Sequence, residues 1–393
     1  MQKLIEFTLC GSYSKNYDPY AATEDVSTQR ILLAINQQPL SLPEISAKTS
    51  LEKHEVLQRL KALERCQLVK VSAKAEDLYY QPNFTIFMLK DQEKLQPLIK
   101  KLSESMVDVV KGFLPKIKME MRNIKCIKAG HVFPDLEYII VGAYAFDYVG
   151  LEFLQEEGLL ISKEMPGGNY IFTGLERGAL NLRESWMWGH SCKYGKYIFN
   201  THGKLPPTSW RKAFPDLGYV WTYYAEDKEE RKAIEQKIVC YGDLLYEILK
   251  GHRSLDKLAT ALGRRKHEVV IDLTFLEELE YVVSVIKHDK REYVLNRPVL
   301  FFSDYKRIHK LSKTILTQFF NNTLKAYYNE LESSYNETSP AKNGIDLREA
   351  FNPIYHRVFE KALDELIASK VICAPPLRRD GQYSAWVAIE TKQ

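Results

Sequence analysis

Two clusters of side chains have the types and spacing needed to bind phosphate groups and the edges of nucleic-acid bases. The first consists of Lys53, His54, Gln58, Arg59 and Lys61, with Lys70 and Lys74 further along the chain. The second consists of Arg264, Arg265, Lys266 and His267, with Lys287, Lys290 and Arg291 further along. Arginine pairs with guanine and glutamine with adenine through two hydrogen bonds each, while lysine and arginine neutralise phosphates. We therefore predict that these residues contact nucleic acid, and that the second cluster is the more strongly basic.

The two clusters stand at equivalent positions of a repeated sequence. The tetrapeptide Lys-His-Glu-Val at residues 53–56 recurs at 266–269, which defines a repeat offset of 266 − 53 = 213. Other matches keep the same offset: Ile35/Ile248, Ser41/Ser254, Leu42/Leu255, Leu60/Leu273, Glu64/Glu277, Val69/Val282, Lys74/Lys287 and Tyr80/Tyr293. The sequence therefore predicts a duplicated module. Because Arg264 and Arg265 replace Leu51 and Glu52, we expect the two copies to bind unequally.

Apolar periodicity predicts three short helices and a two-stranded hairpin in each copy. Ser41 and Glu44 are spaced as a capping box at the start of the second helix of the first copy. Each basic cluster lies on the third helix, and its downstream residues lie on the hairpin. In the second copy, Gly263 supplies the turn before the third helix, and residues 288–290 form the hairpin turn.

This layout resembles the winged helix-turn-helix of DNA-binding proteins, and more specifically the ArsR/MarR-like regulators, in which dimerisation helices follow the module. The resemblance covers residues 28–120 and 241–331, and it rests on layout, since the metal-binding CxC element of some ArsR-type sensors is absent. It implies that the third helix enters the major groove and that the chain is a single-chain pseudo-dimer, whether monomeric or further paired as a homodimer. Two such helices related by a two-fold axis would address half-sites about 34 Å apart.

The expected fold class is α+β, mainly helical, with tandem winged-helix modules in a pseudo-two-fold arrangement around an aromatic-rich central insert. Residues 1–27 are expected to form a loosely packed arm, and Gly112 and Pro115 to bend or break a long helix over residues 92–121. Tyr138 to Leu154 is expected to be a buried helix.

The domain boundaries are an arm at 1–27, a first module at 28–90, a long helix with a small α/β-hairpin module at 91–172, the insert at 173–237, a second module at 238–300, and a second long helix with its α/β-hairpin module at 301–393.

The insert at residues 173–237 has no counterpart in the repeat and holds four of the five tryptophans. One interpretation is a small-molecule effector pocket lined by Trp186, Trp188, His190, Tyr194 and Trp210. The alternative, which the residue types favour, is that these aromatic side chains fill a core.

Composition and motifs exclude several other classes of protein. The six cysteines form no CxxC pair, which is typical of reduced thiols in a cytoplasmic protein, and no apolar run is long enough for a membrane span. His190, Cys192, His202 and His131 lack the paired spacing of a zinc site. The glycines at 189 and 195 lack the spacing of a phosphate-binding loop, and no catalytic constellation is present. We therefore expect no enzyme, no cofactor and no metal.

Two functions remain open at this point. The first is a cytoplasmic transcriptional regulator that binds double-stranded DNA through both third helices. The second is an interaction scaffold in replication, transcription or chromosome machinery, in which the modules contact proteins. Acidic residues at 272–280 and Ile271, which replaces Gln58, point to the second for the later copy. Exposed apolar patches would favour the scaffold, and uninterrupted basic faces the regulator.

Overall fold

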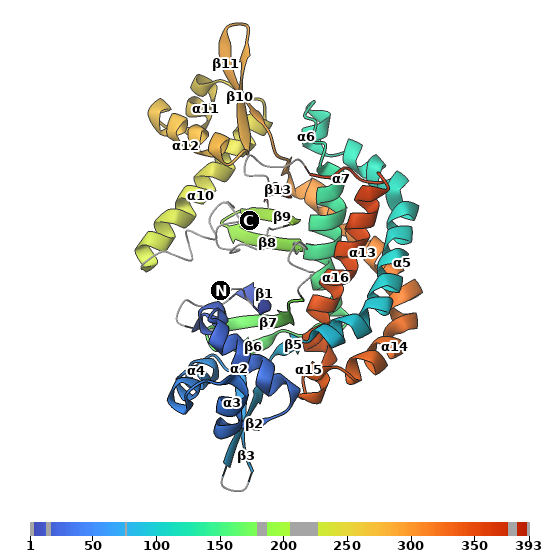
Figure 1. Ribbon diagram of the computed structural model, residues 1–393. Coiled ribbons are helices and arrows are strands. Elements are labelled where there is room, and N and C mark those ends of the chain that lie inside the picture. The colour runs from blue at the N-terminus through green and yellow to red at the C-terminus, as the bar shows by residue number, and fades with distance from the viewer. Residues whose placement is uncertain are drawn as a thin grey trace. The chain divides into compact units, whose positions relative to one another are not determined.

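The computed structural model describes residues 4–12, 17–74, 77–178, 187–204, 227–375 and 383–390. The fold is α+β and mainly helical, with several small sheets, as the sequence predicted (Figure 1). The chain divides into two compact units that each contain three separate segments. Unit 1 consists of Met1–Ser105, Leu151–Arg183 and Phe320–Lys361, and unit 2 of Met106–Gly150, Glu184–Phe319 and Ala362–Gln393.

The start of the chain is packed, so the prediction of a loose arm is wrong for its described part. Strand β1 (Ile5–Ser12) pairs along its whole length with β7 (Gly168–Glu176). Ile5 is fully buried and Phe7 stacks on Phe172 with ring centroids 5.3 Å apart. The sequence signal was weak because the partner strand lies far away along the chain.

The first module folds into three helices and a hairpin, at the boundaries expected from apolar periodicity. Its elements are α2 (Val26–Gln37), β2 (Leu40–Ser41), α3 (Leu42–Thr49), α4 (Lys53–Arg65), β3 (Val69–Lys74) and β4 (Asp77–Pro82). The Glu44 carboxylate accepts hydrogen bonds from the Ser41 N–H and hydroxyl at 2.7 and 2.8 Å, which confirms the predicted pairing of these residues. One face of α4 packs in the core through the buried side chains of Val56, Leu60 and Leu63.

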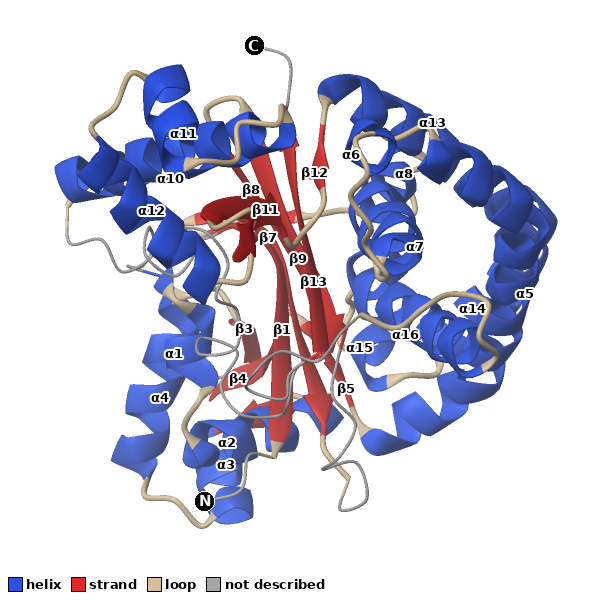
Figure 2. Cartoon of the chain, turned by 90° about the horizontal axis from the view of Figure 1, so that it is seen from above, coloured by secondary structure: helices blue, strands red, loops and turns tan. Residues whose placement is uncertain are grey.

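The second module has the same order of three helices and a hairpin, without a described strand at the place of β2. They are α10 (Lys228–Leu249), α11 (Leu255–Leu262), α12 (Lys266–Glu278), β10 (Val282–Lys287) and β11 (Lys290–Leu295). Figure 2 shows the three helices gathered beside one another. Gly263 ends α11 in the left-handed region at φ 61°, as predicted. His288 and Asp289 also have positive φ, which makes the two-residue turn that suits the twist of a hairpin.

Each unit also has a sheet with one central strand that pairs with a strand on either side. In unit 1, β7 lies between β1, which is antiparallel, and β5, which is parallel; in unit 2, β13 lies between β9, antiparallel, and β12, parallel. One further strand completes each sheet: β6 pairs with β7, and β8 pairs with β9. The bounds are β5 (Thr85–Phe87), β6 (Lys163–Met165), β8 (Met187–Tyr194), β9 (Tyr197–Lys204), β12 (Val299–Leu300) and β13 (Tyr383–Glu390).

Helices connect these sheets and modules. They are α1 (Pro19–Thr23), α5 (Leu89–Arg122), α6 (Lys125–Lys128), α7 (Leu136–Tyr138), the π-helix η2 (Ile139–Tyr148), α8 (Val149–Glu156), α13 (Phe302–Phe319), the π-helix η5 (Phe320–Leu324), α14 (Lys325–Asn336), α15 (Ser339–Lys342) and α16 (Leu347–Ala368). Of the bend or break expected at Gly112 and Pro115, the break is wrong, because α5 runs through both residues, and the bend stays a prediction. The buried helix expected from Tyr138 is confirmed, although much of it is wound as η2.

Candidate nucleic-acid interface

Helix α4 presents a polar, basic stripe on the side opposite its core face. The helical period that buries Val56, Leu60 and Leu63 leaves His54, Gln58, Lys61 and Arg65 exposed at intervals of three and four residues. We call these four residues the α4 stripe. Three of them were predicted from the sequence. Arg65 was missed, although its position seven residues after Gln58 was a signal for it.

Most of the predicted contacts on α4 are available to a ligand. Lys53, His54, Gln58 and Lys61 are exposed and make no hydrogen bond or ion pair with any described residue. Arg59 differs, because its Nε lies 3.0 Å from the Asp25 carboxylate and its Nη1 3.0 Å from Glu55. Burial alone would raise the pKa of Asp25, but hydrogen bonds from the Thr28 N–H and from Arg59 hold it below its usual value. Arg59 therefore ties α4 to the start of α2.

The hairpin of the first module adds less than the sequence suggested. Lys70 donates a 2.7 Å hydrogen bond to the Asn343 carbonyl within unit 1. Burial, and then the nearby charge of Lys163, lower the pKa of Lys70. The Lys74 side chain lies outside the described residues. The structure therefore places Lys70 against the protein rather than toward a ligand.

The second basic cluster is largely neutralised by acidic neighbours, which corrects the expectation that it is the stronger one. Arg264 Nη2 lies 2.7 Å from the Asp272 carboxylate, and Arg265 is paired with Glu268. Two further pairs are Lys266 with Asp256 and Arg291 with Glu277. The side chains of His267, Lys287 and Lys290 remain exposed and make no hydrogen bond or ion pair with any described residue. The Arg265–Glu268 pair could have been predicted from its spacing of three residues on one helix. Spacing gives no information on the pairs of Arg264, Lys266 and Arg291, because their acidic partners lie further away along the chain.

Asp272 is the centre of this neutralised cluster. Its side chain is fully buried, and it accepts from Arg264 while also pairing with Lys237 on α10. The Arg264 side chain is itself 20% exposed. A buried carboxylate requires compensating charge, so these two basic groups stabilise Asp272 and have little capacity left for phosphates.

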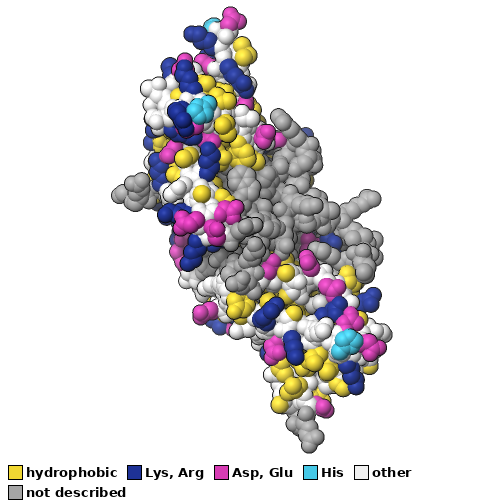
Figure 3. All heavy atoms as spheres, turned by 90° about the vertical axis from the view of Figure 1, so that its left-hand side faces the viewer, with side chains coloured by type: hydrophobic (Ala, Val, Ile, Leu, Met, Phe, Trp, Pro, Cys, Tyr) yellow, Lys and Arg dark blue, Asp and Glu magenta, His cyan; other side chains and the backbone are white. Residues whose placement is uncertain are grey.

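The exposed stripe of α12 is chemically different from the α4 stripe. At the repeat offset, Gln58, Lys61 and Arg65 are replaced by Ile271, Thr274 and Glu278. Ile271 is 62% exposed and Val270 38% exposed. Figure 3 shows Lys and Arg interspersed with Asp and Glu on the face of the molecule that carries this helix. At these three positions α12 therefore lacks the glutamine and arginine side chains that pair with adenine and guanine through two hydrogen bonds.

Most of the predicted effector pocket lies outside the described residues. This applies to Trp186 and Trp210, and to the side chains of Trp188 and His190 on β8. Tyr194 is described and is 6% exposed, with its ring 6.5 Å from that of Phe199. Its burial beside another aromatic ring fits the interpretation that the described part of the insert fills a core.

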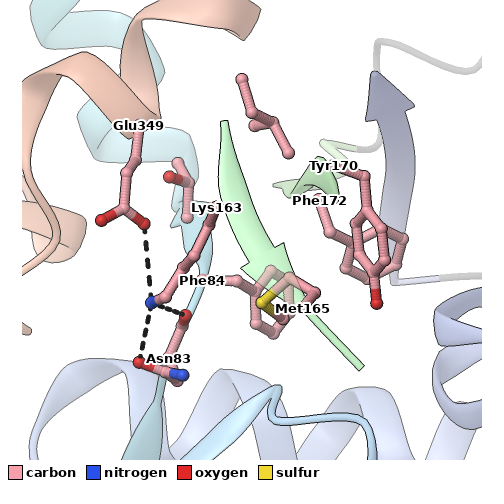
Figure 4. A pocket seen from close by; sticks show the side chains of 9 residues that line it. Asn83, Phe84, Lys163, Met165, Tyr170, Phe172 and Glu349 are labelled. Atoms are coloured by element: carbon pink, nitrogen blue, oxygen red, sulfur yellow. Dashed lines mark hydrogen bonds and ion pairs between the residues drawn. The ribbon is translucent and has the colours of Figure 1, made fainter. Parts of the chain in front are cut away.

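A small pocket lies elsewhere, in unit 1, beside β6 and β7 (Figure 4). Lys163 reaches across it, with its Nζ 3.2 Å from Asn83 Oδ1 and 3.7 Å from the Glu349 carboxylate. The space is about 20 Å³, which is sufficient for roughly one water molecule. This pocket therefore does not replace the predicted effector site.

The histidines weighed as metal ligands have other contacts. His202 is fully buried, with Nδ1 2.9 Å from the Tyr138 hydroxyl and Nε2 3.6 Å from the Asp147 carboxylate. His131 stacks on Phe133, and burial followed by the charge of Arg253 lowers its pKa. The side chains of His190 and Cys192 lie outside the described residues. Over the described part of the chain, no three His, Cys, Asp or Glu side chains are grouped to hold a metal ion.

Comparison with known proteins identifies no relative: neither a protein-family model nor a curated protein matches the chain. Among the described helices, none combines the length and the apolar character required to cross a membrane.

Proposed function

We propose that the chain is a double-stranded DNA-binding regulator whose main contact is helix α4. The observation that carries this proposal is the α4 stripe, which is exposed, polar and free of acidic residues. The order of three helices and a hairpin supports an assignment of both modules as winged helices, in which the third helix enters the major groove. In this assignment, Gln58 and Arg65 face base edges, while Lys53 and Lys61 neutralise phosphates.

The second part of the proposal is that the chain contains two copies of one arrangement. The chain segments that make up the two units support it. Shifting the segment Met106–Gly150 of unit 2 by the repeat offset gives positions 319–363, and unit 1 contains Phe320–Lys361. The two segments therefore match to within two residues at each boundary while belonging to opposite units. The two sheets also agree, since β7 and β13 each lie between one antiparallel and one parallel strand. A pseudo-dimer with exchanged helices accounts for both observations.

A second candidate function, protein contact, is favoured for the second module alone. Five of its apolar side chains are more than a third exposed: Val270, Ile271, Val283, Val285 and Ile286. Exposed apolar groups of this kind, beside neutralised basic residues, were the feature expected of a scaffold. We therefore propose that the first module binds DNA and the second supports assembly.

The test of DNA binding is the salt dependence of affinity for random duplex. Replacing Lys53 and Lys61 by Ala should reduce the slope of log K against log salt by about two units if both contact phosphates. The matched control replaces Lys90 and Lys111, two exposed lysines that lie on α5 instead of α4, and should leave the slope unchanged.

Equal slopes for the two double variants would overturn the assignment of α4. Selection of bound sequences then tests the pseudo-dimer, because two winged helices acting together require a palindromic or direct-repeat consensus. A consensus limited to one short site would mean that only α4 reads bases.

A further inference from the structure

Helix α13 in unit 2 has a basic face on its exposed side. The side chains that pack it into the unit recur at intervals of three and four residues along one side, from Ile308 to Phe319. Lys306, Arg307 and Lys310 stand outside this stripe and are exposed. Asp304, the one acidic residue of the helix, is 1% exposed. The outer face of α13 therefore carries positive charge without an acidic side chain beside it on the same helix.

Helix α5 extends this basic face. Arg307 Nε lies 3.5 Å from the Glu120 carboxylate, which places the end of α5 beside the start of α13 within unit 2. Lys116 stands one turn before Glu120 on the same edge of α5 and is exposed. We call Lys116, Lys306, Arg307 and Lys310 the α13 surface. Arg307 has acidic partners, whereas the three lysines form no ion pair with any described residue.

The equivalent face of unit 1 provides an internal comparison, because its charges are balanced. Shifted by the repeat offset of 213, α13 corresponds to residues 89–106 in the first half of α5, and Glu93 replaces Lys306. Two lysines on this part of α5 are paired with glutamates in or next to α14: Lys94 with Glu337 and Lys101 with Glu330. A pair of long helices can therefore pack in this chain with its surface charges neutralised. The excess positive charge on α13 is not a requirement of the packing.

The residue types of the α13 surface fit a chain of phosphates better than a membrane or a protein. A helix that binds a membrane inserts large apolar side chains, and a protein interface has apolar or aromatic anchors at its centre. None of the exposed large apolar side chains among the described residues lies on α13. The helix instead exposes Ser303 and Gln318, whose polar groups can donate to phosphate oxygens beside the cations.

We propose that the α13 surface binds the phosphate backbone of double-stranded DNA, as a second contact that reads no bases. The proposal rests on the DNA-binding function proposed above and adds to it a site in the other unit. Lys306 and Lys310 are one helical turn apart, about 6 Å along the axis, and a duplex carries about one charge per 1.7 Å of its length. Each lysine can therefore neutralise a phosphate of its own. Because phosphates are the same at every base pair, this contact raises affinity without changing sequence preference.

The first test is the salt dependence of affinity for random duplex, measured with the full chain. Lys306→Ala combined with Lys310→Ala should reduce the slope of log K against log salt by about two units. The matched control, Lys94→Ala combined with Lys101→Ala, removes the same charge from the equivalent face of unit 1. Its slope should stay unchanged, because glutamates already neutralise these lysines. Equal slopes for the two double variants, with thermal unfolding unaltered, overturn the proposal.

The α4 variant separates a failure of this proposal from a failure of the proposed function. If Lys53→Ala with Lys61→Ala reduces the slope and the α13 variant does not, α4 binds DNA and the α13 surface does not. The reverse result supports the α13 surface and contradicts the assignment of α4. A wild-type chain that does not bind duplex at low salt overturns both.

A second test compares a duplex selected for tight binding with a shuffled duplex of the same composition. The α13 double variant should weaken binding to both by the same factor, about tenfold, because phosphate contacts carry no sequence information. A loss confined to the selected duplex would contradict a backbone contact. Vesicles of phosphatidylserine test the membrane as the alternative partner. Vesicle binding that requires Lys306 and Lys310, with duplex binding unaffected by their loss, overturns the proposal.

Discussion

Arg59 and Asp272 occupy the same place in the two modules, the seventh residue of the third helix, but carry opposite charges. Each residue ties its helix to the first helix of its module, Arg59 through Asp25 and Asp272 through Lys237. The polarity of the tie is reversed, but in both modules the residue on the third helix is the more buried member: Arg59 is 25% exposed against 53% for Asp25, and Asp272 is fully buried against 42% for Lys237. The same helix packing is therefore compatible with either sign of charge.

The modules differ on their surfaces much more than in their cores. Val56 and Leu60 are buried on α4, as are Val269 and Leu273 on α12. Core positions are restricted by close packing, whereas an exposed side chain can change type at little cost to stability. Three helices and a hairpin with similar cores can therefore present a polar, basic stripe in one module and an apolar surface in the other.

The largest expected effect is the difference in stability loss between replacing Asp272 and replacing Arg59. Asp272→Ala should lower the free energy of unfolding by about 3 kcal/mol, because it leaves the partly buried Arg264 without its compensating charge. Arg59→Ala should cost less than about 1 kcal/mol, since its pair with Asp25 is largely solvated. Urea denaturation followed by circular dichroism measures both. Equal losses of unfolding free energy would show that the buried pair of Asp272 stabilises its module no more than the solvated pair of Arg59.

The next effect concerns the α4 stripe. Replacing Gln58 by Ile, Lys61 by Thr and Arg65 by Glu gives α4 the residues of α12. We expect affinity for duplex DNA to fall about 100-fold at low salt, because two cationic contacts and one base contact are lost. Fluorescence anisotropy with a labelled duplex measures the change, and thermal unfolding checks the fold. Undiminished affinity would mean that α4 is not the reading helix.

The reciprocal exchange should have a smaller effect of opposite sign. Ile271→Gln, Thr274→Lys and Glu278→Arg together give α12 the polar, basic stripe. We expect affinity to rise only a few-fold, because Asp272 still holds Arg264 within the protein. The same anisotropy measurement applies. A gain as large as the loss on α4 would show that the surface residues alone decide which module binds DNA.

The smallest expected effect is a pH-dependent change in stability that separates the second helices of the two modules, α3 and α11. Hydrogen bonds from the Ser41 N–H and hydroxyl hold the pKa of Glu44 below its usual value, whereas Lys257 stands at the matching place in α11. A carboxylate whose pKa is lowered in the folded state contributes its full stabilisation to the fold when the pH is above its unfolded pKa of about 4.5. This contribution is lost as the pH falls through the pKa of the folded state. Glu44→Gln should therefore slightly lower the melting temperature at pH 7, with the difference disappearing near pH 3. A difference that persists at pH 3 would refute the assignment to charge.

Sequence reasoning located the features that depend on local pattern. It placed α4 and α12, the pairing of Ser41 with Glu44, and the turn at His288 and Asp289, since helix period, capping and turn chemistry act over a few residues. It missed the packing of β1 and the neutralisation of Arg264 by Asp272. Both depend on which side chains or strands meet in three dimensions, and neither leaves a periodic signal in the sequence.

Each unit is built from three segments that alternate along the chain with those of the other unit, which has a consequence for the order of folding. Unit 1 includes Phe320–Lys361, so its last segment leaves the ribosome only after most of the chain has been synthesised. Unit 2 in turn requires Met106–Gly150, which is made early and must wait for its partners. Contacts over such long separations slow folding, because the intervening loops must close first. A fragment that ends between the two modules therefore contains neither unit in full, and we expect it to remain incompletely folded until the rest of the chain is supplied.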